Sequence, residues 1–186
     1  AALKYFGERE PIKTVECHTF PDLFKTIKDE QDCYAVMAIE NTVAGTILPN
    51  YALLREAAVT VIGEVYLRIQ QNLMVLNGQT IAQLKEVHSH PMAILQCHKF
   101  FEQYPHIRLV ETIDTAFSAK EVSSKQLKRI GAIASSVAAG HYNLTMIAES
   151  IETNKQNYTR FLVLQHSNRV KKMTRKPTKA SICFHL

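Results

Sequence analysis

The sequence predicts an α/β fold. Short apolar runs typical of strands alternate along the chain with longer stretches in which apolar residues recur at helical spacing. Pro21, Pro49 and Pro91 stand where a first helical turn would begin, a position that suits a fixed φ and a missing N–H. Alternation of this kind is typical of domains built on mostly parallel sheets.

Nine apolar segments are predicted as strands. In chain order they are 13–17, 34–39, 59–65, 67–76, 86–88, 107–111, 131–134, 145–148 and 161–164. The chain opens on a helical pattern in which Ala2, Leu3 and Phe6 share one face. A further helix is expected from Pro91 to about Tyr104.

Length and composition exclude several classes of protein. The 186 residues suffice for one domain or two small lobes, and 46% hydrophobic with 21% charged residues is ordinary for a globular protein. The longest apolar run, Tyr34–Ile39, is too short to span a membrane. No signal-peptide pattern is visible, and the four cysteines are scattered without a CxxC pair. We therefore expect reduced thiols, a cytoplasmic location and no membrane partner.

The positive net charge of +5 comes from one segment. Six of the 22 basic residues lie within 169–179, which holds no acid, and the remaining 16 basic residues face 17 acidic ones. The segment lacks the interleaved aromatics of a nucleic-acid interface. It is predicted to be an exposed linker, because its like charges repel one another, and no nucleic-acid partner is expected.

Candidate functional residues follow the predicted strands, because ligands in open α/β sheets sit beyond the carboxyl ends of the strands. Glu40 and Asn41 follow 34–39 and precede Gly45. The pattern fits an Asx-type turn, in which the Asn side chain binds its own backbone, and it also fits a polar site.

The second candidate place is the start of the helix at Pro91. Ser89 and Gln96 are seven positions apart, close to two full helical turns, so both project to one side if the helical register extends back to Ser89. The free N–H groups of a helix start form an anion site. The alternative is a plain Ser or His cap with Gln96 on the surface. His88, His90 and His98 do not predict a metal site, because no Cys or acid completes one.

Two further places carry polar residues. Asp114 and Thr115 open a predicted helix over 116–123, where an N-cap is the default explanation. Two helix starts that faced one cleft would hold the two carboxylates of a small dianion. The run NYTRF (157–161) directly precedes a buried strand and is not a turn signature. Its Asn-x-Thr pattern also fits a glycosylation acceptor, an interpretation that a cytosolic location excludes.

Several of these segments together resemble the catalytic domain of prephenate dehydratase. The segments are AIENTVAG (38–45), GEVYLRIQQNLMV (63–75), VHSHPMAILQC (87–97), DTAFSAK (114–120), AIASSVAA (132–139) and ETNKQNYTRFLVL (152–164). They cover nearly the whole chain in the family's order, and SHPxAxxQC with NxTRF at this separation is highly specific. The basic run and the segment KASICFHL (179–186) resemble the linker and opening strand of the ACT regulatory domain that follows in this family.

The resemblance implies a fold of two α/β lobes like that of type II periplasmic binding proteins, with the active-site cleft between the lobes. The catalytic domain would cover 1–168, with one lobe of about 1–76 plus 158–168 and a second of about 77–157. The linker would cover 169–179 and the ACT strand 180–186. Phenylalanine would then be an allosteric partner, and a homodimer or homotetramer is expected.

The implied activity is that of a carbon–oxygen lyase without a cofactor or metal, which converts prephenate to phenylpyruvate in phenylalanine biosynthesis. By matching position, the implied catalytic residues are Asn41, Ser89, Gln96 and Thr159. The implied substrate-binding residues are Glu40, Thr115, Arg160 and Phe161.

Physical chemistry is consistent with this assignment. A threonine hydroxyl is too weak an acid to be ionised near neutrality, so Thr159 would donate a hydrogen bond to the leaving oxygen. Arg160 could bind a substrate carboxylate or pin its loop to Glu40. The alternative function is a non-catalytic two-lobed module that binds a small molecule or senses an effector; it would keep the polar donors but would not need Thr159.

Overall fold

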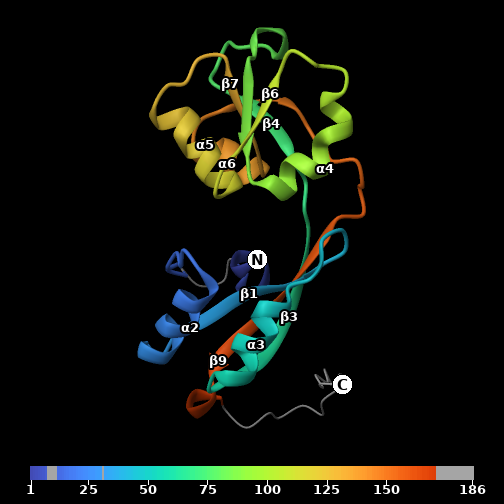
Figure 1. The fold of residues 1–186 in the computed structure, drawn as a ribbon. Coiled ribbons are helices and arrows are strands. Elements are labelled where there is room, and N and C mark those ends of the chain that lie inside the picture. Colours follow the sequence, from blue (N-terminus) through green and yellow to red (C-terminus); the bar gives the residue numbers. More distant parts are fainter. Residues whose placement is uncertain (8–11, 31, 171–186) are drawn as a thin grey trace. The chain divides into compact units, whose positions relative to one another are not determined.

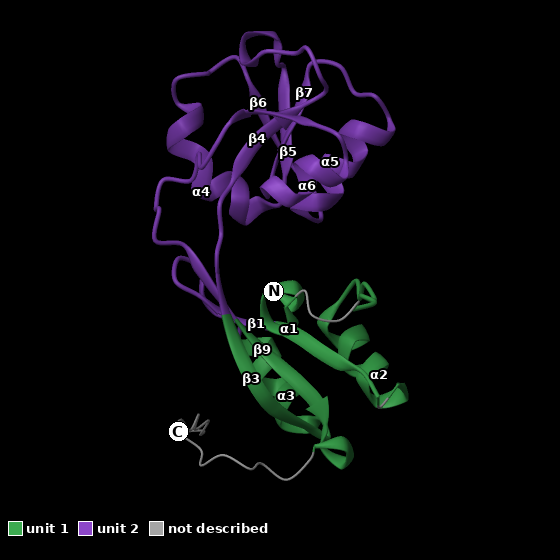
Figure 2. Cartoon of the chain, turned by 180° about the vertical axis from the view of Figure 1, so that it is seen from behind, with its two compact units in different colours: residues 1–37, 48–65, 161–186 green, residues 38–47, 66–160 purple. Residues whose placement is uncertain are grey.

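The computed structural model describes residues 1–7, 12–30 and 32–170. The chain divides into two compact units, one of residues 1–37, 48–65 and 161–186 and the other of residues 38–47 and 66–160 (Figure 2). We refer to them as unit 1 and unit 2. The predictions made for 171–186, which include the ACT strand and most of the linker, lie outside the described residues.

Three of the described helices begin at, or one residue before, the prolines that mark their predicted starts, and α5 begins one residue before its predicted start (Figure 1). Within the described ranges they are α1 (Ala2–Phe6), α2 (Phe20–Asp29), α3 (Leu48–Glu56), α4 (Pro91–Phe101), α5 (Thr115–Ser124) and α6 (Ser136–His141), with single 3₁₀ turns at Ile81–Gln83 and Ser167–Arg169. Pro21, Pro49 and Pro91 each lie in the first or second position of a helix, which confirms their predicted role. None of the described helices is long and apolar enough to cross a membrane.

Most of the predicted strands are present. The described strands are β1 (Tyr34–Asn41), β2 (Gly45–Thr46), β3 (Val59–Arg68), β4 (Asn72–Val75), β5 (Glu86–Ser89), β6 (Arg108–Glu111), β7 (Ile130–Ala134), β8 (Thr145–Ala148) and β9 (Tyr158–His166). The prediction for 13–17 is wrong, because that segment forms no strand and its central Val15 is 59% exposed. The predicted strand 67–76 divides between the end of β3 and β4.

Unit 2 contains a five-stranded sheet in the order β6-β5-β7-β4-β8. Strand β5 runs parallel to β6 and β7, whereas β4 runs antiparallel to β7 and β8. Four of the five strands therefore run in one direction, as expected for a mostly parallel sheet, and β4 is the exception. The apolar run of β4 does not reveal its opposite direction, because Leu73, Met74 and Val75 are all fully buried, and burial on both faces gives the same pattern in either direction.

Helices cover both faces of this sheet (Figure 1). Leu73 and Val75 of β4 point to the face that packs against α4, through residues such as Cys97. Met74 points to the opposite face, where it packs with Val122 of α5 and Ala139 of α6. Because successive side chains of a strand point to opposite faces, β4 contributes residues to the hydrophobic cores on both faces of the sheet.

A four-stranded sheet has the order β2-β1-β9-β3. Strands β1, β9 and β3 each contribute residues to both units. In unit 1, the ring of Tyr5 from α1 lies against Gly63 of β3, and Phe6 packs on Tyr34 with ring centroids 5.0 Å apart. Arg169, the first residue of the predicted linker, pairs with Asp32 at 3.2 Å.

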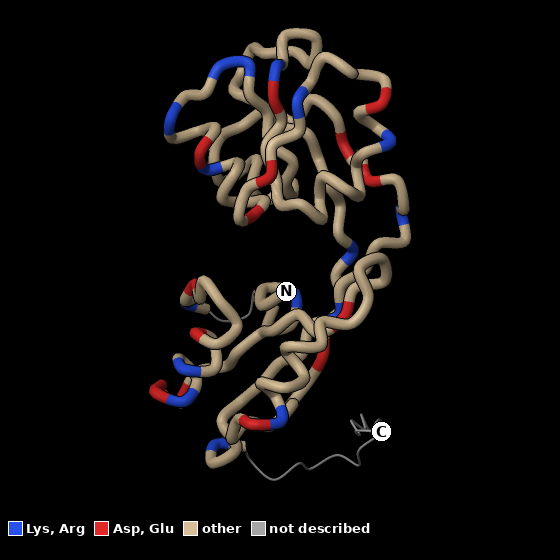
Figure 3. Tube along the Cα trace, in the orientation of Figure 1, with Lys and Arg blue, Asp and Glu red and all other residues tan. Residues whose placement is uncertain are grey.

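Charges of both signs are interspersed along the described residues (Figure 3). This distribution agrees with the nearly balanced charge of the chain outside 169–179.

Candidate functional site

A connected set of side-chain amides lies in unit 2, and Asn41 at the end of β1 is its first member. The Asn41 Oδ1 atom accepts hydrogen bonds from the backbone N–H groups of Val43 (2.9 Å) and Ala44 (2.8 Å), so the predicted Asx turn is confirmed. The same side chain also binds outside its turn: Nδ2 donates to Thr159 Oγ1 at 2.9 Å and to Asn157 Oδ1 at 2.7 Å. The turn and the polar contacts that the sequence left as alternatives therefore occur together.

Asn157 connects Asn41 to helix α4. It is fully buried, and its Nδ2 donates to Gln96 Oε1 at 2.9 Å. The Gln71 Nε2 atom donates to the same oxygen at 3.3 Å. The backbone carbonyl of Gln96 accepts from the N–H of Thr153 at 2.9 Å, which ties α4 to the segment that leads into β9. We call Asn41, Asn157 and Gln96 the amide series.

Three of the four predicted catalytic residues are thus brought together. Asn41 contacts Thr159 directly, and Gln96 is joined to them through Asn157. Thr159 is 8% exposed and lies on β9 beside β1 in the sheet. Sheet neighbours bring residues distant in sequence side by side, so the position of Thr159 follows from the fold.

Ser89 is not joined to the amide series by the described contacts. It is the last residue of β5, and α4 begins only at Pro91 with His90 as its cap, so the helical register does not extend back to Ser89. The Ser89 hydroxyl is fully buried and donates to the carbonyl of Ile133 at 2.7 Å. Its catalytic role stays a prediction.

Arg160 and Glu40 form an ion pair between β9 and β1, with Arg160 Nη1 3.2 Å from Glu40 Oε2. The Arg160 side chain is 14% exposed and that of Glu40 39% exposed. Glu40, Arg160, Tyr66 and Tyr158 line a small hollow of about 210 Å³, together with Asn41. The pinning contact that the sequence suggested is present, and the binding of a substrate carboxylate stays a prediction.

The two remaining predicted residues lie elsewhere. Thr115 is the first residue of α5, and the preceding Asp114 caps that helix by accepting from the N–H of Phe117 at 2.9 Å. Phe161 is a half-buried residue of β9 that belongs to unit 1. The described contacts join neither Thr115 nor Phe161 to the amide series, and their substrate-binding roles stay predictions.

Sequence reasoning missed three buried polar residues around Gln96. Asn157 lies inside the NYTRF run, but its burial could not be foreseen from a position just before a strand. Gln71 and Glu152 are 6% and 1% exposed, and Glu152 Oε2 accepts from the backbone N–H of Gln71 at 2.9 Å. Within the described part of the chain, the other Glu152 oxygen is buried without a partner. A polar residue such as Gln71 inside an apolar strand-like run was the available signal.

Cys97 lies one position after Gln96 and points into the core. Its burial raises the pKa of the thiol to about 12, with a smaller contribution from the nearby Glu152 carboxylate. The thiol is therefore protonated at neutral pH, and Cys97 acts as an apolar core residue rather than a nucleophile.

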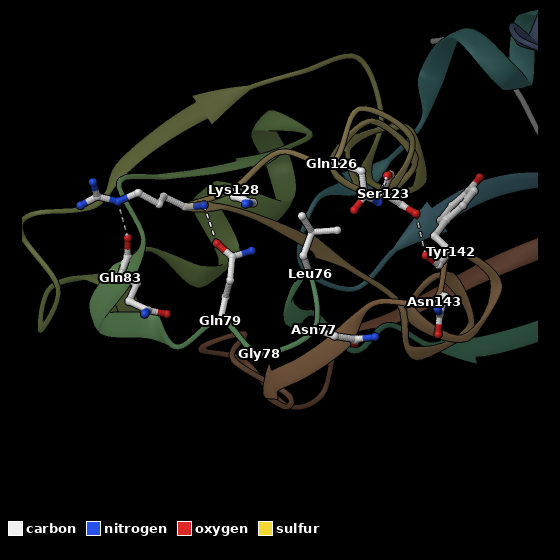
Figure 4. A pocket seen from close by; sticks show the side chains of 11 residues that line it. Leu76, Asn77, Gly78, Gln79, Gln83, Ser123, Gln126, Lys128, Tyr142 and Asn143 are labelled. Atoms are coloured by element: carbon white, nitrogen blue, oxygen red, sulfur yellow. Dashed lines mark hydrogen bonds between the residues drawn. The ribbon is translucent and has the colours of Figure 1, made fainter.

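A hollow lies beside α4 and is lined by Gln96 of the amide series. It has a volume of about 410 Å³ and is also lined by Val43, Met92 and Thr153. A larger hollow of about 590 Å³ lies among Gln79, Gln83, Ser123, Gln126, Lys128 and Asn143 (Figure 4).

The larger hollow contains no predicted site residue, and it lies where the chain enters β7 rather than beyond the carboxyl ends of the parallel strands. The hollow beside α4 is the better candidate, because it is lined by Gln96, one of the predicted site residues. Among the residues that the structure describes, no three His, Cys, Asp or Glu side chains gather as a metal site.

Comparison with known proteins agrees with this fold. Residues 1–169 match the family model described as prephenate dehydratase. The arogenate dehydratase 2 of Petunia hybrida is 38% identical over 175 residues, which are 94% of this chain and 44% of that relative. The chain therefore spans less than half of that protein's length.

Two solved structures share the fold. GqqA, described as a novel type of quorum quenching acylase, superposes with a TM-score of 0.77 at 29% identity, covering 91% of this chain and 60% of its own. The prephenate dehydratase of Staphylococcus aureus subsp. aureus Mu50 gives a TM-score of 0.70 at 27% identity, covering 89% and 61%. The expected α/β class is confirmed.

Proposed function

Because the chain belongs to the prephenate dehydratase family, we propose that the full protein containing it converts prephenate to phenylpyruvate in phenylalanine biosynthesis. In this reaction two bonds that join substituents to the ring break: the C–O bond to the hydroxyl and the C–C bond to the ring carboxylate. The hydroxyl leaves with a proton as water, the ring carboxylate leaves as carbon dioxide, and the ring becomes aromatic. Because aromatisation drives the reaction, the protein needs to orient the substrate and stabilise the leaving oxygen, without a cofactor.

The contact between Asn41 and Thr159 is the observation that carries this proposal. An amide N–H can only donate, so the Thr159 oxygen accepts at 2.9 Å and its own proton stays available for another acceptor. The leaving oxygen of the substrate is such an acceptor, and it gains negative charge as the C–O bond breaks. A positioned neutral donor stabilises that charge.

The other predicted residues are proposed to act around Thr159. Asn41, Ser89 and Gln96 would complete the catalytic set. Arg160 is proposed to bind a substrate carboxylate while its ion pair with Glu40 holds the guanidinium in place. Thr115 and Phe161 would contribute to substrate binding.

Arogenate is a second candidate substrate, because the petunia relative at 38% identity is named for it. Arogenate carries an amino group where prephenate carries a keto group, and the two share the ring that loses water and carbon dioxide. The proposed role of Thr159 therefore serves both substrates.

Incubation of the full protein with each substrate tests the proposal. We expect prephenate to disappear as phenylpyruvate forms, and the same measurement with arogenate would detect phenylalanine. Binding of prephenate or arogenate without turnover would instead favour the non-catalytic two-lobed module.

Regulation by phenylalanine and assembly as a homodimer or homotetramer are also proposed. Both rest on the resemblance of 179–186 to the start of an ACT domain. Titration of the full protein with phenylalanine during turnover tests the first, and light scattering measures the second. Turnover that is insensitive to phenylalanine would refute the regulatory proposal.

A further inference from the structure

The hydrogen bonds of the amide series have a fixed direction. A carboxamide has one end that only accepts and one end that only donates, so its orientation is set by whichever end meets a group of known type. Backbone N–H groups are of known type, because they can only donate. Those of Val43 and Ala44 lie 2.9 and 2.8 Å from one end of the Asn41 side chain, and that end must be the oxygen.

The direction then passes from Asn41 to Asn157. With its oxygen in the Asx turn, the Asn41 nitrogen donates to Asn157 Oδ1 at 2.7 Å and Thr159 Oγ1 at 2.9 Å, and less closely to the carbonyl of Tyr158 at 3.3 Å. The Asn157 end that faces Asn41 must therefore be an acceptor, which leaves the Asn157 nitrogen on the opposite side. That nitrogen is 2.9 Å from Gln96.

The direction continues from Asn157 to Gln96. The Gln96 end that faces Asn157 must be its oxygen, and the N–H of Gln71 reaches the same oxygen at 3.3 Å. Gln96 is half-buried and lines the hollow beside α4. With the oxygen doubly bound inside, the Gln96 NH₂ group is the end left for a ligand.

The hydrogen-bond directions leave two groups free to donate. The described contacts give the Thr159 hydroxyl and the Gln96 NH₂ group no acceptor, and both are predicted to donate to the substrate. We infer that Asn157 is a positioning residue, which fixes the Gln96 amide with its NH₂ group toward the substrate. This inference rests on the proposed function, because the substrate is what the donor would meet.

Asn157→Asp is the variant that tests this direction. Aspartate has nearly the same shape as asparagine, but it has no N–H to give to Gln96, so Gln96 should rotate and offer its NH₂ group to the carboxylate. The substrate would then meet an oxygen in place of a donor. We expect kcat to fall about 10²-fold, the effect of losing one positioned donor, with little change in KM.

A double variant separates positioning from a merely structural role. If Asn157 acts through Gln96, Asn157→Asp should cost little further kcat in a Gln96→Ala background. Losses that multiply in the double variant would overturn the inference. Asn143→Asp makes the same chemical change in the turn after α6 and should leave kcat unchanged.

Asn157→Asp buries a carboxylate, so its folding is checked by thermal unfolding. If it does not fold, Asn157→Ala replaces it. The alanine variant frees Gln96 to rotate without burying a charge, and we expect a smaller but measurable loss of kcat. A wild-type kcat in Asn157→Ala would contradict the inference.

Hydrogen exchange of side-chain amides tests the direction without substrate. In the wild-type protein the buried, bonded Asn157 NH₂ protons should exchange about tenfold or more slowly than those of Gln96. In Asn157→Asp the Gln96 protons should become the slow ones. Equal protection of both groups in the wild type would overturn the inference. If the protein turns over neither prephenate nor arogenate, the proposed function fails while this result still decides the orientation.

Discussion

Asn41 donates its side-chain N–H to the hydroxyl of Thr159 across 2.9 Å, although 118 positions separate the two residues along the chain. The contact exists because β1 and β9 are neighbours in the sheet. Asn41 closes the end of β1, and Thr159 lies at the start of β9. The segment around Asn41 and the run NYTRF (157–161), which lie far apart in the sequence, are therefore parts of one site.

Thr159→Ala should lower kcat roughly 10²–10³-fold with little change in KM, because the donor acts on charge that develops only in the transition state. Steady-state kinetics with prephenate measures the effect. Thr159→Ser keeps the hydroxyl and should restore most of the activity. A rise in KM at unchanged kcat would assign Thr159 to substrate binding.

Glu86→Gln should weaken the fold at neutral pH but not in acid. Hydrogen bonds from His88, and then from Arg108, hold the pKa of the Glu86 carboxyl below its ordinary 4.5. A lowered folded-state pKa stabilises the fold above pH 4.5, and this contribution disappears as the pH falls through the folded-state pKa.

Urea unfolding at several pH values between 7 and 3 measures the difference in the free energy of unfolding between wild type and Glu86→Gln. We expect this difference to disappear as the pH falls toward 3. Glu149→Gln removes an exposed carboxylate that makes none of the described contacts, and it controls for the change in net charge. A gap that is constant with pH would contradict the prediction.

Cys97 should resist alkylation in the native protein. Its buried thiol has a pKa of about 12, and the thiolate is the reactive form. A variant with Cys17, Cys33 and Cys183 replaced by serine isolates this thiol, and iodoacetamide labelling at pH 8 is followed by mass spectrometry. Labelling should begin only when denaturant is added; rapid labelling of the folded protein would show that the thiol is accessible.

Gly63→Ala should destabilise unit 1. A Cβ at this position of β3 would overlap the outer atoms of the Tyr5 ring, so the ring must move away and its packing against β3 is lost. We expect the melting temperature to fall by several degrees, since about 1 kcal/mol corresponds to roughly 2–4 °C in a protein of this size.

Gly140→Ala is the matched control for this substitution. A Cβ at Gly140, in α6, meets nothing within 4 Å. Alanine should stabilise that helix by roughly 0.5–1 kcal/mol. If both variants destabilise equally, the close approach of Tyr5 is not the cause.

The sequence predicted features that depend on local geometry. Pro91 marked the start of α4 because its missing N–H is harmless only in the first helical turn. Glu40 and Asn41 at the end of β1 were found because ligands in α/β folds bind beyond the carboxyl ends of strands. Asp114 was interpreted correctly as a cap, because capping needs only a side chain three residues from its partner.

Features that depend on distant parts of the chain escaped prediction. The direction of β4 is decided by β7 and β8, which its own apolar residues do not identify. Ser89 failed to follow the helical register because β5 extends to it through pairing with β6. Asn157 was overlooked because its burial depends on Asn41 and Gln96 meeting it from either side.

The main-chain origin of the Asx turn affects how this site can evolve. Val43 and Ala44 orient the Asn41 side chain through backbone N–H groups, which every amino acid except proline supplies. Their side chains therefore do not determine this orientation. Both side chains are also exposed. The Asx turn itself therefore tolerates any residue except proline at positions 43 and 44, and only the hollow that Val43 lines limits the choice of side chain at position 43.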